Sequence, residues 1–181
     1  SFSFNFDPQK VEEVKTSNRI IKGKIPAQGT KEIFKRLEDV ESRSMHGQIP
    51  IIWDKAEGYN IYDIEGNKWI DFTSTIFVAN VGHSNSRVKK YIQETLSNPL
   101  ISCYAYSNQT RVKYLEKLIE FAGPPFEKAF LLSAGTESTE AALKLMRMNG
   151  QKNGKRRLGI ICIENNWHGR TLGAQMMSGN D

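Results

Sequence analysis

Residues 130–147, FLLSAGTESTEAALKLMR, contain a short apolar run, then a glycine, then a helical pattern. This order predicts a buried strand that ends near Leu132, a turn at Gly135 and a helix capped by Thr136. The first amide groups of a helix lack internal partners and the helix dipole is positive there, so this turn can hold a phosphate. Strand, glycine and helix also follow one another in most α/β domains, where the turn binds nothing.

The predicted helix has one narrow face of mostly small residues, which would let it lie flat on a sheet. Four positions at helical spacing form this face: Ser138, Ala141, Ala142 and Leu145. Two acidic residues near the start of the helix, Glu137 and Glu140, would oppose a bound dianion unless their side chains point away.

The composition is ordinary for a globular protein, with 181 residues of which 39% are hydrophobic. No apolar run is long enough to span a membrane and no signal-peptide pattern is present, so we expect a cytoplasmic protein without a membrane partner. Cys103 and Cys162 lie in apolar surroundings, which predicts reduced core thiols. The three histidines are too scattered to predict a metal site: His46, His83 and His168.

The net charge of +5 does not by itself predict a nucleic-acid partner, because acids and bases alternate along most of the chain. The densest basic cluster, in QKNGKRRLG at residues 151–159, contains glycine and asparagine and is typical of a solvated loop. No recognition motif or interleaved aromatic residue accompanies it, so we expect no nucleic acid to bind.

The first part of the chain predicts an extended arm, a helix and a small antiparallel sheet. Residues 1–30 are polar and irregular, with one short helix expected at 10–15. Thr30 resembles a helix cap before an apolar stripe formed by Ile33, Phe34, Leu37 and Val40. Residues 51–72 alternate apolar pairs with turn signals, which predicts a meander of two or three strands.

The second part alternates helices and strands. Helices are predicted at residues 86–97 and 107–121, a buried strand in LGIICIEN at 158–165, and a short helix after the turn at Trp167. This order predicts an α/β fold with a mainly parallel sheet. We therefore assign residues 1–80 to a small domain and residues 81–181 to the first part of a large domain. Two strands make a poor parallel sheet, so the large domain is expected to be incomplete and the chain a fragment.

Four motifs in this order resemble the class III aminotransferases, which are pyridoxal-phosphate enzymes of fold type I. The motifs are IYDIEGNKWIDF, NVGH, SAGTESTEAALKLMR and NNWHGRT. The resemblance covers residues 51–178, whereas the first fifty residues are only loosely similar. It implies a transaminase that moves an amino group from a primary amine or amino acid to a keto acid through pyridoxal and pyridoxamine phosphate, and it implies a homodimer.

The resemblance also implies roles for individual residues. The amides of Gly135 and Thr136 would hold the phosphate of pyridoxal 5'-phosphate, and Trp167 would stack on its ring, although Trp167 is also compatible with an ordinary packing role. Ile76 and Phe77 match positions at the mouth of the substrate pocket. An apolar residue at such a position belongs to the hydrophobic core as often as it lines the pocket. His168 is expected to shape its turn and to transfer no proton.

The chain departs from the family pattern at several positions. Ala134 replaces a usual serine, Ser138 replaces a usual alanine, and the common proline after Gly-His is absent from residues 84–86. The backbone contacts expected at Gly135 do not depend on these side chains. The family's Schiff-base lysine and the aspartate that pairs with the pyridine nitrogen are expected downstream of Asp181, so we assign no catalytic residue here and expect the chain alone to be inactive.

Two alternatives remain open at the level of sequence. An aminomutase or racemase on the same scaffold would need the same sites. A module that binds a phosphate ligand without catalysis, or a structural fragment without a ligand, would instead be a native product that ends near Asp181. The intact mass of the native polypeptide separates the module from the enzyme.

Overall fold

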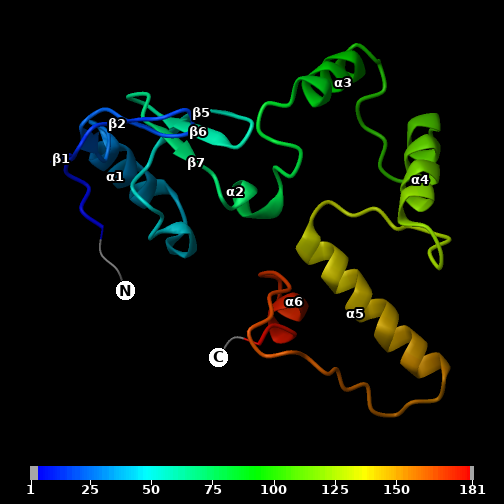
Figure 1. The fold of residues 1–181 in the computed structure, drawn as a ribbon. Helices are drawn as coiled ribbons and strands as arrows, with labels where there is room; N and C mark the ends of the chain where they lie inside the picture. The colour runs from blue at the N-terminus through cyan, green and yellow to red at the C-terminus, as the bar shows by residue number, and fades with distance from the viewer. Residues whose placement is uncertain (1–3, 180–181) are drawn as a thin grey trace. The chain divides into compact units, whose positions relative to one another are not determined.

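The computed structural model describes residues 4–179. The chain divides into two compact units, and the division falls between Ser102 and Cys103. Unit 1 contains β1 (Gln9–Lys10), β2 (Val14–Lys15), β3 (Ile20–Ile21), β4 (Lys24–Ile25), α1 (Thr30–Val40), η1 (Arg43–Met45), β5 (Trp53–Glu57), β6 (Asn60–Asp63), β7 (Lys68–Ile70), α2 (Ser74–Phe77) and α3 (Ser86–Leu96) (Figure 1). Unit 2 contains α4 (Gln109–Ala122), α5 (Gly135–Lys152) and α6 (Leu172–Met176). The predicted domain boundary after residue 80 concerns the whole protein and stays a prediction.

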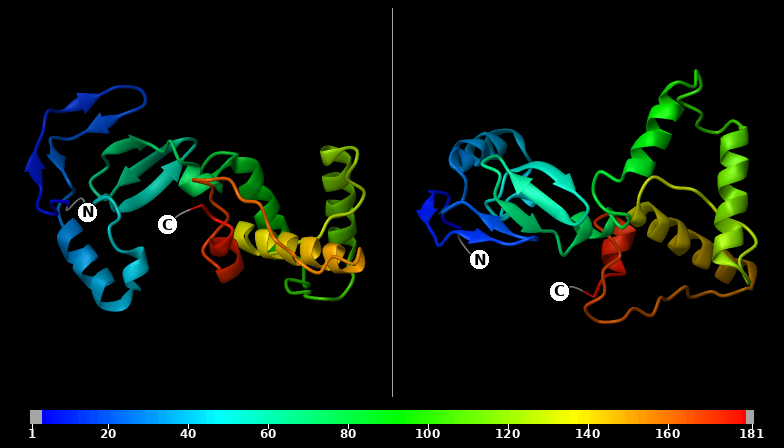
Figure 2. Two further views of the ribbon diagram at one scale, coloured as in Figure 1. Left: turned by 90° about the horizontal axis from the view of Figure 1, so that it is seen from below. Right: turned by 45° about the horizontal axis from the view of Figure 1, so that its top comes forward.

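Unit 1 is built on a five-stranded antiparallel sheet with the order β2-β3-β7-β6-β5. The predicted meander is confirmed as β5, β6 and β7, and β6 and β7 run side by side in both views of Figure 2. The helix expected at residues 10–15 is wrong, because β1 and β2 lie in this part of the arm. The Thr16 hydroxyl accepts hydrogen bonds from the amides of Asn18 and Arg19, which favours the turn of the β2-β3 hairpin over a helix.

The turn between β6 and β7 connects the sheet to the N-terminal arm. The buried carboxylate of Asp63 accepts hydrogen bonds from the amides of Glu65 and Asn67 and from the Asn67 side chain. The oxygen of the fully buried Asn67 amide group then accepts from the backbone N–H of Lys22 at 2.7 Å. The arm continues along the turn, where the Lys22 ammonium donates to the Glu65 carbonyl and the Gln28 amide donates to the Glu65 carboxylate.

The start of α1 differs from the prediction that Thr30 caps this helix. Gly29 is the N-cap, with a left-handed φ of 84°, and Thr30 is the buried first residue of the helix. Glycine adopts this conformation without steric cost, so it ends the arm and allows Thr30 to be fully buried, with its amide donating to the carbonyl of the buried Ala27.

Unit 2 contains the predicted helices, but the two predicted parallel strands do not pair within the described residues. Residues 130–132 and 158–163 have no regular secondary structure, and all the strands assigned between residues 4 and 179 lie in unit 1 and pair antiparallel. A strand is stabilised by hydrogen bonds to its neighbours, and these apolar segments have none in the described chain. Most of their side chains are accordingly exposed, up to 100% at Ile161.

Helices α3 and α4 form close to the predicted positions, but the apolar face of α3 is exposed and that of α4 is only partly buried. Val88, Tyr91, Ile92 and Leu96 of α3 are all exposed. The prediction of core thiols is wrong as well, because Cys162 is exposed and Cys103 is only partly buried. Among residues 4–179 no helix is long and apolar enough to cross a membrane.

Candidate functional site

The N-terminus of α5 is open at the residues predicted to hold a phosphate. Ala134 is the extended N-cap, Gly135 is the first helical residue, and in the described chain no side chain caps the helix. The predicted cap at Thr136 is therefore wrong, because the Thr136 hydroxyl lies 3.0 Å from that of Thr171 instead. A Cβ at Gly135 would meet no atom within 4 Å. The glycine thus leaves free space beside the first amides of the helix, and its backbone there is helical.

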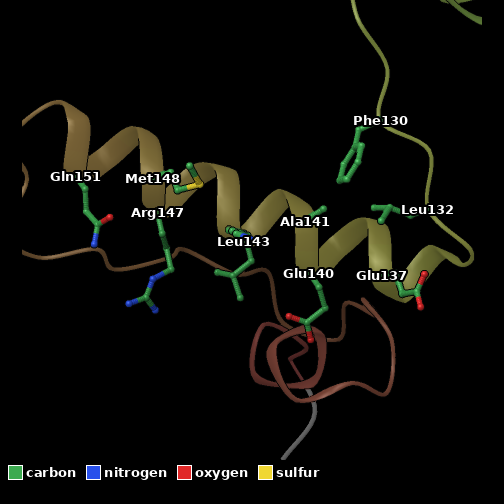
Figure 3. A pocket seen from close by; sticks show the side chains of 10 residues that line it. Phe130, Leu132, Glu137, Glu140, Ala141, Leu143, Arg147, Met148 and Gln151 are labelled. Atoms are coloured by element: carbon green, nitrogen blue, oxygen red, sulfur yellow. The ribbon is translucent and has the colours of Figure 1, made fainter. Parts of the chain in front are cut away.

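The two acidic residues near this end of α5 form hydrogen bonds within the chain. The Glu137 carboxylate accepts from the backbone N–H of Ser133 at 2.9 Å. Glu140 points to the segment that contains α6, as Figure 3 shows. Hydrogen bonds from the Thr171 hydroxyl and the Ala174 amide lower the pKa of Glu140 against a smaller effect of burial, so this group is anionic at neutral pH.

The predicted Trp167 turn lies against the start of α5. The segment after α5 runs back to its N-terminal end, where residues 165–179, here called the Trp167 loop, fold around α6 (Figure 1). The Thr139 hydroxyl donates to the carbonyl of His168 at 2.7 Å, and the Ser178 hydroxyl accepts from the His168 amide at 3.2 Å. A Cβ at Gly169, whose φ is 128°, would collide with the Thr136 side chain. The loop therefore approaches the helix so closely that only glycine fits at this position.

Trp167 itself is 61% exposed, and the guanidinium carbon of Arg170 lies 5.7 Å from its ring centroid. A planar ring is thus available on the loop that packs against Thr136 and Thr139. An uncapped helix start, open space at a glycine and an accessible aromatic face fit a ligand that combines a phosphate with a flat ring. Pyridoxal phosphate has both parts.

Ile76 and Phe77, predicted to line a substrate pocket, belong to unit 1 and lie in α2. The four residues of Ser74–Phe77 have positive φ angles between 48° and 68° and therefore form one left-handed turn. The side chains of Ile76 and Phe77 are 74% and 77% exposed. Left-handed backbone costs about 1 to 2 kcal/mol for each such residue, so other contacts must stabilise this turn.

The stabilising contacts come from Asp71, whose side chain is 4% exposed. Its carboxylate accepts from the Thr73 amide and hydroxyl and from the Thr75 amide at 2.9 to 3.0 Å, and it lies 2.8 Å from Nε2 of His83. Burial alone would raise the pKa of Asp71, but the hydrogen bonds from His83, Thr73 and Thr75 lower it to about 2. His83 is in turn fixed by two backbone hydrogen bonds to Gly58.

A groove of about 600 Å³ follows one side of α5 (Figure 3). Phe130 and Leu132 from the unpaired apolar segment line it together with Leu143 and Met148 of the helix. Gly135, Thr136 and Trp167 do not line it, so this groove is separate from the candidate phosphate position.

The prediction from sequence missed the residues that join α5 to the Trp167 loop. Thr136, Thr139 and Glu140 lie on one face of α5 and all bond to this loop, whereas the predicted packing face around Ala142 and Leu145 is exposed. Their spacing of three and four residues was visible in the sequence, but polar side chains at helical spacing usually face solvent.

Comparisons with known proteins identify the family of the chain. The sequence profile of the class III aminotransferases matches residues 42–181. Acetylornithine aminotransferase from Clostridium acetobutylicum is 36% identical over 138 residues, which are 74% of this chain and 34% of that protein. Mitochondrial ornithine aminotransferase from Oryza sativa subsp. japonica is 34% identical over 152 residues, or 82% of this chain and 32% of that protein.

Solved structures show the same fold. Ornithine aminotransferase from Toxoplasma gondii superposes with a TM-score of 0.73 at 21% identity, covering 86% of this chain and 37% of that one. Taurine:2-oxoglutarate aminotransferase from Bifidobacterium kashiwanohense, solved with PLP and glutamate, gives a TM-score of 0.71 at 25% identity and covers 83% and 33%. The chain thus has part of fold type I and spans about a third of the length of the relatives it matches. By this match over most of its length, the chain belongs to the class III aminotransferase family.

Proposed function

We propose that this chain forms part of a pyridoxal-phosphate-dependent transaminase, which moves an amino group from a primary amine or amino acid to a keto acid. One observation carries the proposal: the uncapped start of α5 lies against a loop that presents an accessible tryptophan. Membership of the class III aminotransferases supports the same activity.

The residues of this chain would bind and orient the cofactor. The amides of Gly135 and Thr136 would hold its phosphate, because helix N-termini favour anions. Trp167 would cover one face of the ring and limit its tilt. When bound, pyridoxal phosphate supplies the electron-withdrawing ring that allows the amine to be exchanged. Ile76 and Phe77 would line the substrate pocket of the complete protein, and we assign no proton transfer to a side chain of this chain.

The names of the relatives suggest the first substrates to test. Acetylornithine and ornithine aminotransferases are among the similar proteins, so ornithine and its acetylated form are the first donors, with 2-oxoglutarate as acceptor. A homodimer and a cytoplasmic location remain part of the proposal, although some relatives carry mitochondrial in their names.

The test uses the full-length protein that contains this chain. We expect it to bind pyridoxal phosphate, seen as visible absorbance, and to form glutamate from 2-oxoglutarate only when an amino donor is present. An aminomutase or racemase would convert the donor without consuming a keto acid. Absence of pyridoxal phosphate binding at millimolar cofactor would overturn the proposal.

A further inference from the structure

Glu140 makes a cluster of contacts that a surface helix residue does not normally make. One of its oxygens, Oε1, accepts from the Thr171 hydroxyl at 2.5 Å, from the Gly173 amide at 2.8 Å and from the Ala174 amide at 3.1 Å. These amides are at the start of α6, where backbone N–H groups lack helical partners. Thr171, the N-cap of α6, forms no capping bond of its own, so the carboxylate from α5 takes that place.

The chain around Glu140 is shaped to admit this carboxylate. A Cβ at Gly173 would lie 2.4 Å from Oε2 of Glu140 and 2.9 Å from a methyl group of Leu143, so a larger residue would displace the Glu140 carboxylate from its position. Ala174, the next residue, is fully buried. The close packing at Gly173 and the hydrogen bonds of Glu140 thus both hold α6 in one position against α5.

The Glu140 contacts lie after Trp167 in the sequence, and a contact at the residue next to Trp167 continues them. The carbonyl of His168, the next residue, accepts from Thr139. The ends of the Trp167 loop are joined as well, since the Gly179 amide donates to the Asn166 side chain at 2.6 Å. The backbone after Trp167 is therefore held against α5, the Asn166 side chain before it is joined to the end of the loop, and Glu140 provides the anionic part of this network.

We propose that Glu140 is a positioning residue, which fixes the Trp167 loop on the first turns of α5 and so sets where the indole stands relative to Gly135 and Thr136. This role rests on the proposed function, because it concerns the cofactor that those three residues would bind. The hydrogen bonds of Glu140 in the described chain go to Thr171, Gly173 and Ala174. Glu140 acts through Thr171 and the start of α6.

A double-mutant cycle in the full-length protein tests this role. Glu140→Gln keeps the size of the side chain but removes its charge and one acceptor oxygen. We expect it to weaken pyridoxal phosphate binding about tenfold, because the interaction free energies of neighbouring residues lie in this range. In a Trp167→Ala background the same change should have little further effect, because the ring that Glu140 positions is gone. Glu120→Gln is the matched control, since Glu120 is an exposed acid on α4 that pairs only with Lys117 in the described contacts.

Hydrogen exchange gives a readout that does not depend on the cofactor. Glu140→Gln should speed amide exchange at residues 168–174 in the protein without pyridoxal phosphate, whereas Glu120→Gln should not. If the Glu140→Gln protein does not fold, Thr171→Val removes one donor, retains the carboxylate, and should shift both readouts in the same direction to a smaller extent.

The outcomes separate this role from the proposed function. A wild-type protein that binds no pyridoxal phosphate would overturn both. A wild-type protein that binds it, with effects of Glu140→Gln and Trp167→Ala that simply add, would overturn the positioning role alone and leave Glu140 as a contributor to stability.

Discussion

Asp71→Asn should destabilise unit 1, and the loss should depend on pH. The carboxylate is 4% exposed and accepts hydrogen bonds from Thr73, Thr75 and His83, which together lower its pKa from 3.8 to about 2. A shift of this size corresponds to at most about 2.5 kcal/mol of folding free energy at neutral pH. Because the folded-state pKa is lowered, this contribution is complete above about pH 5 and is lost as the pH falls through 4 toward 2.

Denaturant unfolding of the wild type and Asp71→Asn at pH 7 and pH 3 measures this contribution. Tryptophan fluorescence is a suitable signal, since the Trp53 ring packs edge-on against His83 at 5.9 Å. The variant should lose about 2 kcal/mol at pH 7, and the difference should shrink at pH 3. Asp7→Asn is the control, because Asp7 pairs with Lys31 on the surface, and such pairs contribute little. Equal stability of Asp71→Asn and wild type at pH 7, or a difference that does not change with pH, would refute the reasoning.

Three further changes test the candidate site. Gly135→Val should leave the fold intact, because this backbone is helical, but should crowd the phosphate position and lower cofactor occupancy after dialysis. At saturating cofactor, Trp167→Ala should lower turnover more than tenfold, which corresponds to a rise of about 1.4 kcal/mol in the activation free energy, whereas Trp167→Phe should keep most of the activity. Equal turnover of the two variants would make Trp167 an ordinary packing residue. Gly169→Ala places a methyl group against Thr136 and should destabilise the protein by about 2 kcal/mol in thermal unfolding. Gly154→Ala places its methyl group in open space and should destabilise it by only about 1 kcal/mol. Similar losses in the two variants would argue against close packing of the Trp167 loop.

Helices could be predicted from the sequence because their signal is local. The spacing of apolar residues predicted α1, α3, α4 and α5, and the turn at Trp167 predicted α6. The meander of unit 1 was predicted for the same reason, since its strands are adjacent in sequence and joined by short turns. The apolar runs at 130–132 and 158–163 were read as strands, but strand pairing depends on neighbours that no local pattern supplies.

The details of the site depend on partners that are distant in sequence. Thr30 and Thr136 both look like caps, yet Gly29 takes the capping position in one helix and Thr171 engages the hydroxyl in the other. The contacts of Glu140 could not be predicted from a local pattern, because its partners begin 31 residues later. The binding roles of Gly135, Thr136 and Trp167, and the pocket role of Ile76 and Phe77, came from the resemblance and stay predictions.

The turn between β6 and β7 restricts how the length of this chain can change. A short hairpin loop is usually where a protein accepts extra residues. Here Glu65 and Asn67 supply acceptors for Lys22 and Gln28, so the loop is also the attachment site of a segment about forty residues earlier. One inserted residue would displace those acceptors by about 3.3 Å, more than a hydrogen bond tolerates. Homologues that keep the arm should therefore keep this loop at constant length, and those that have lost the arm should be free to vary it.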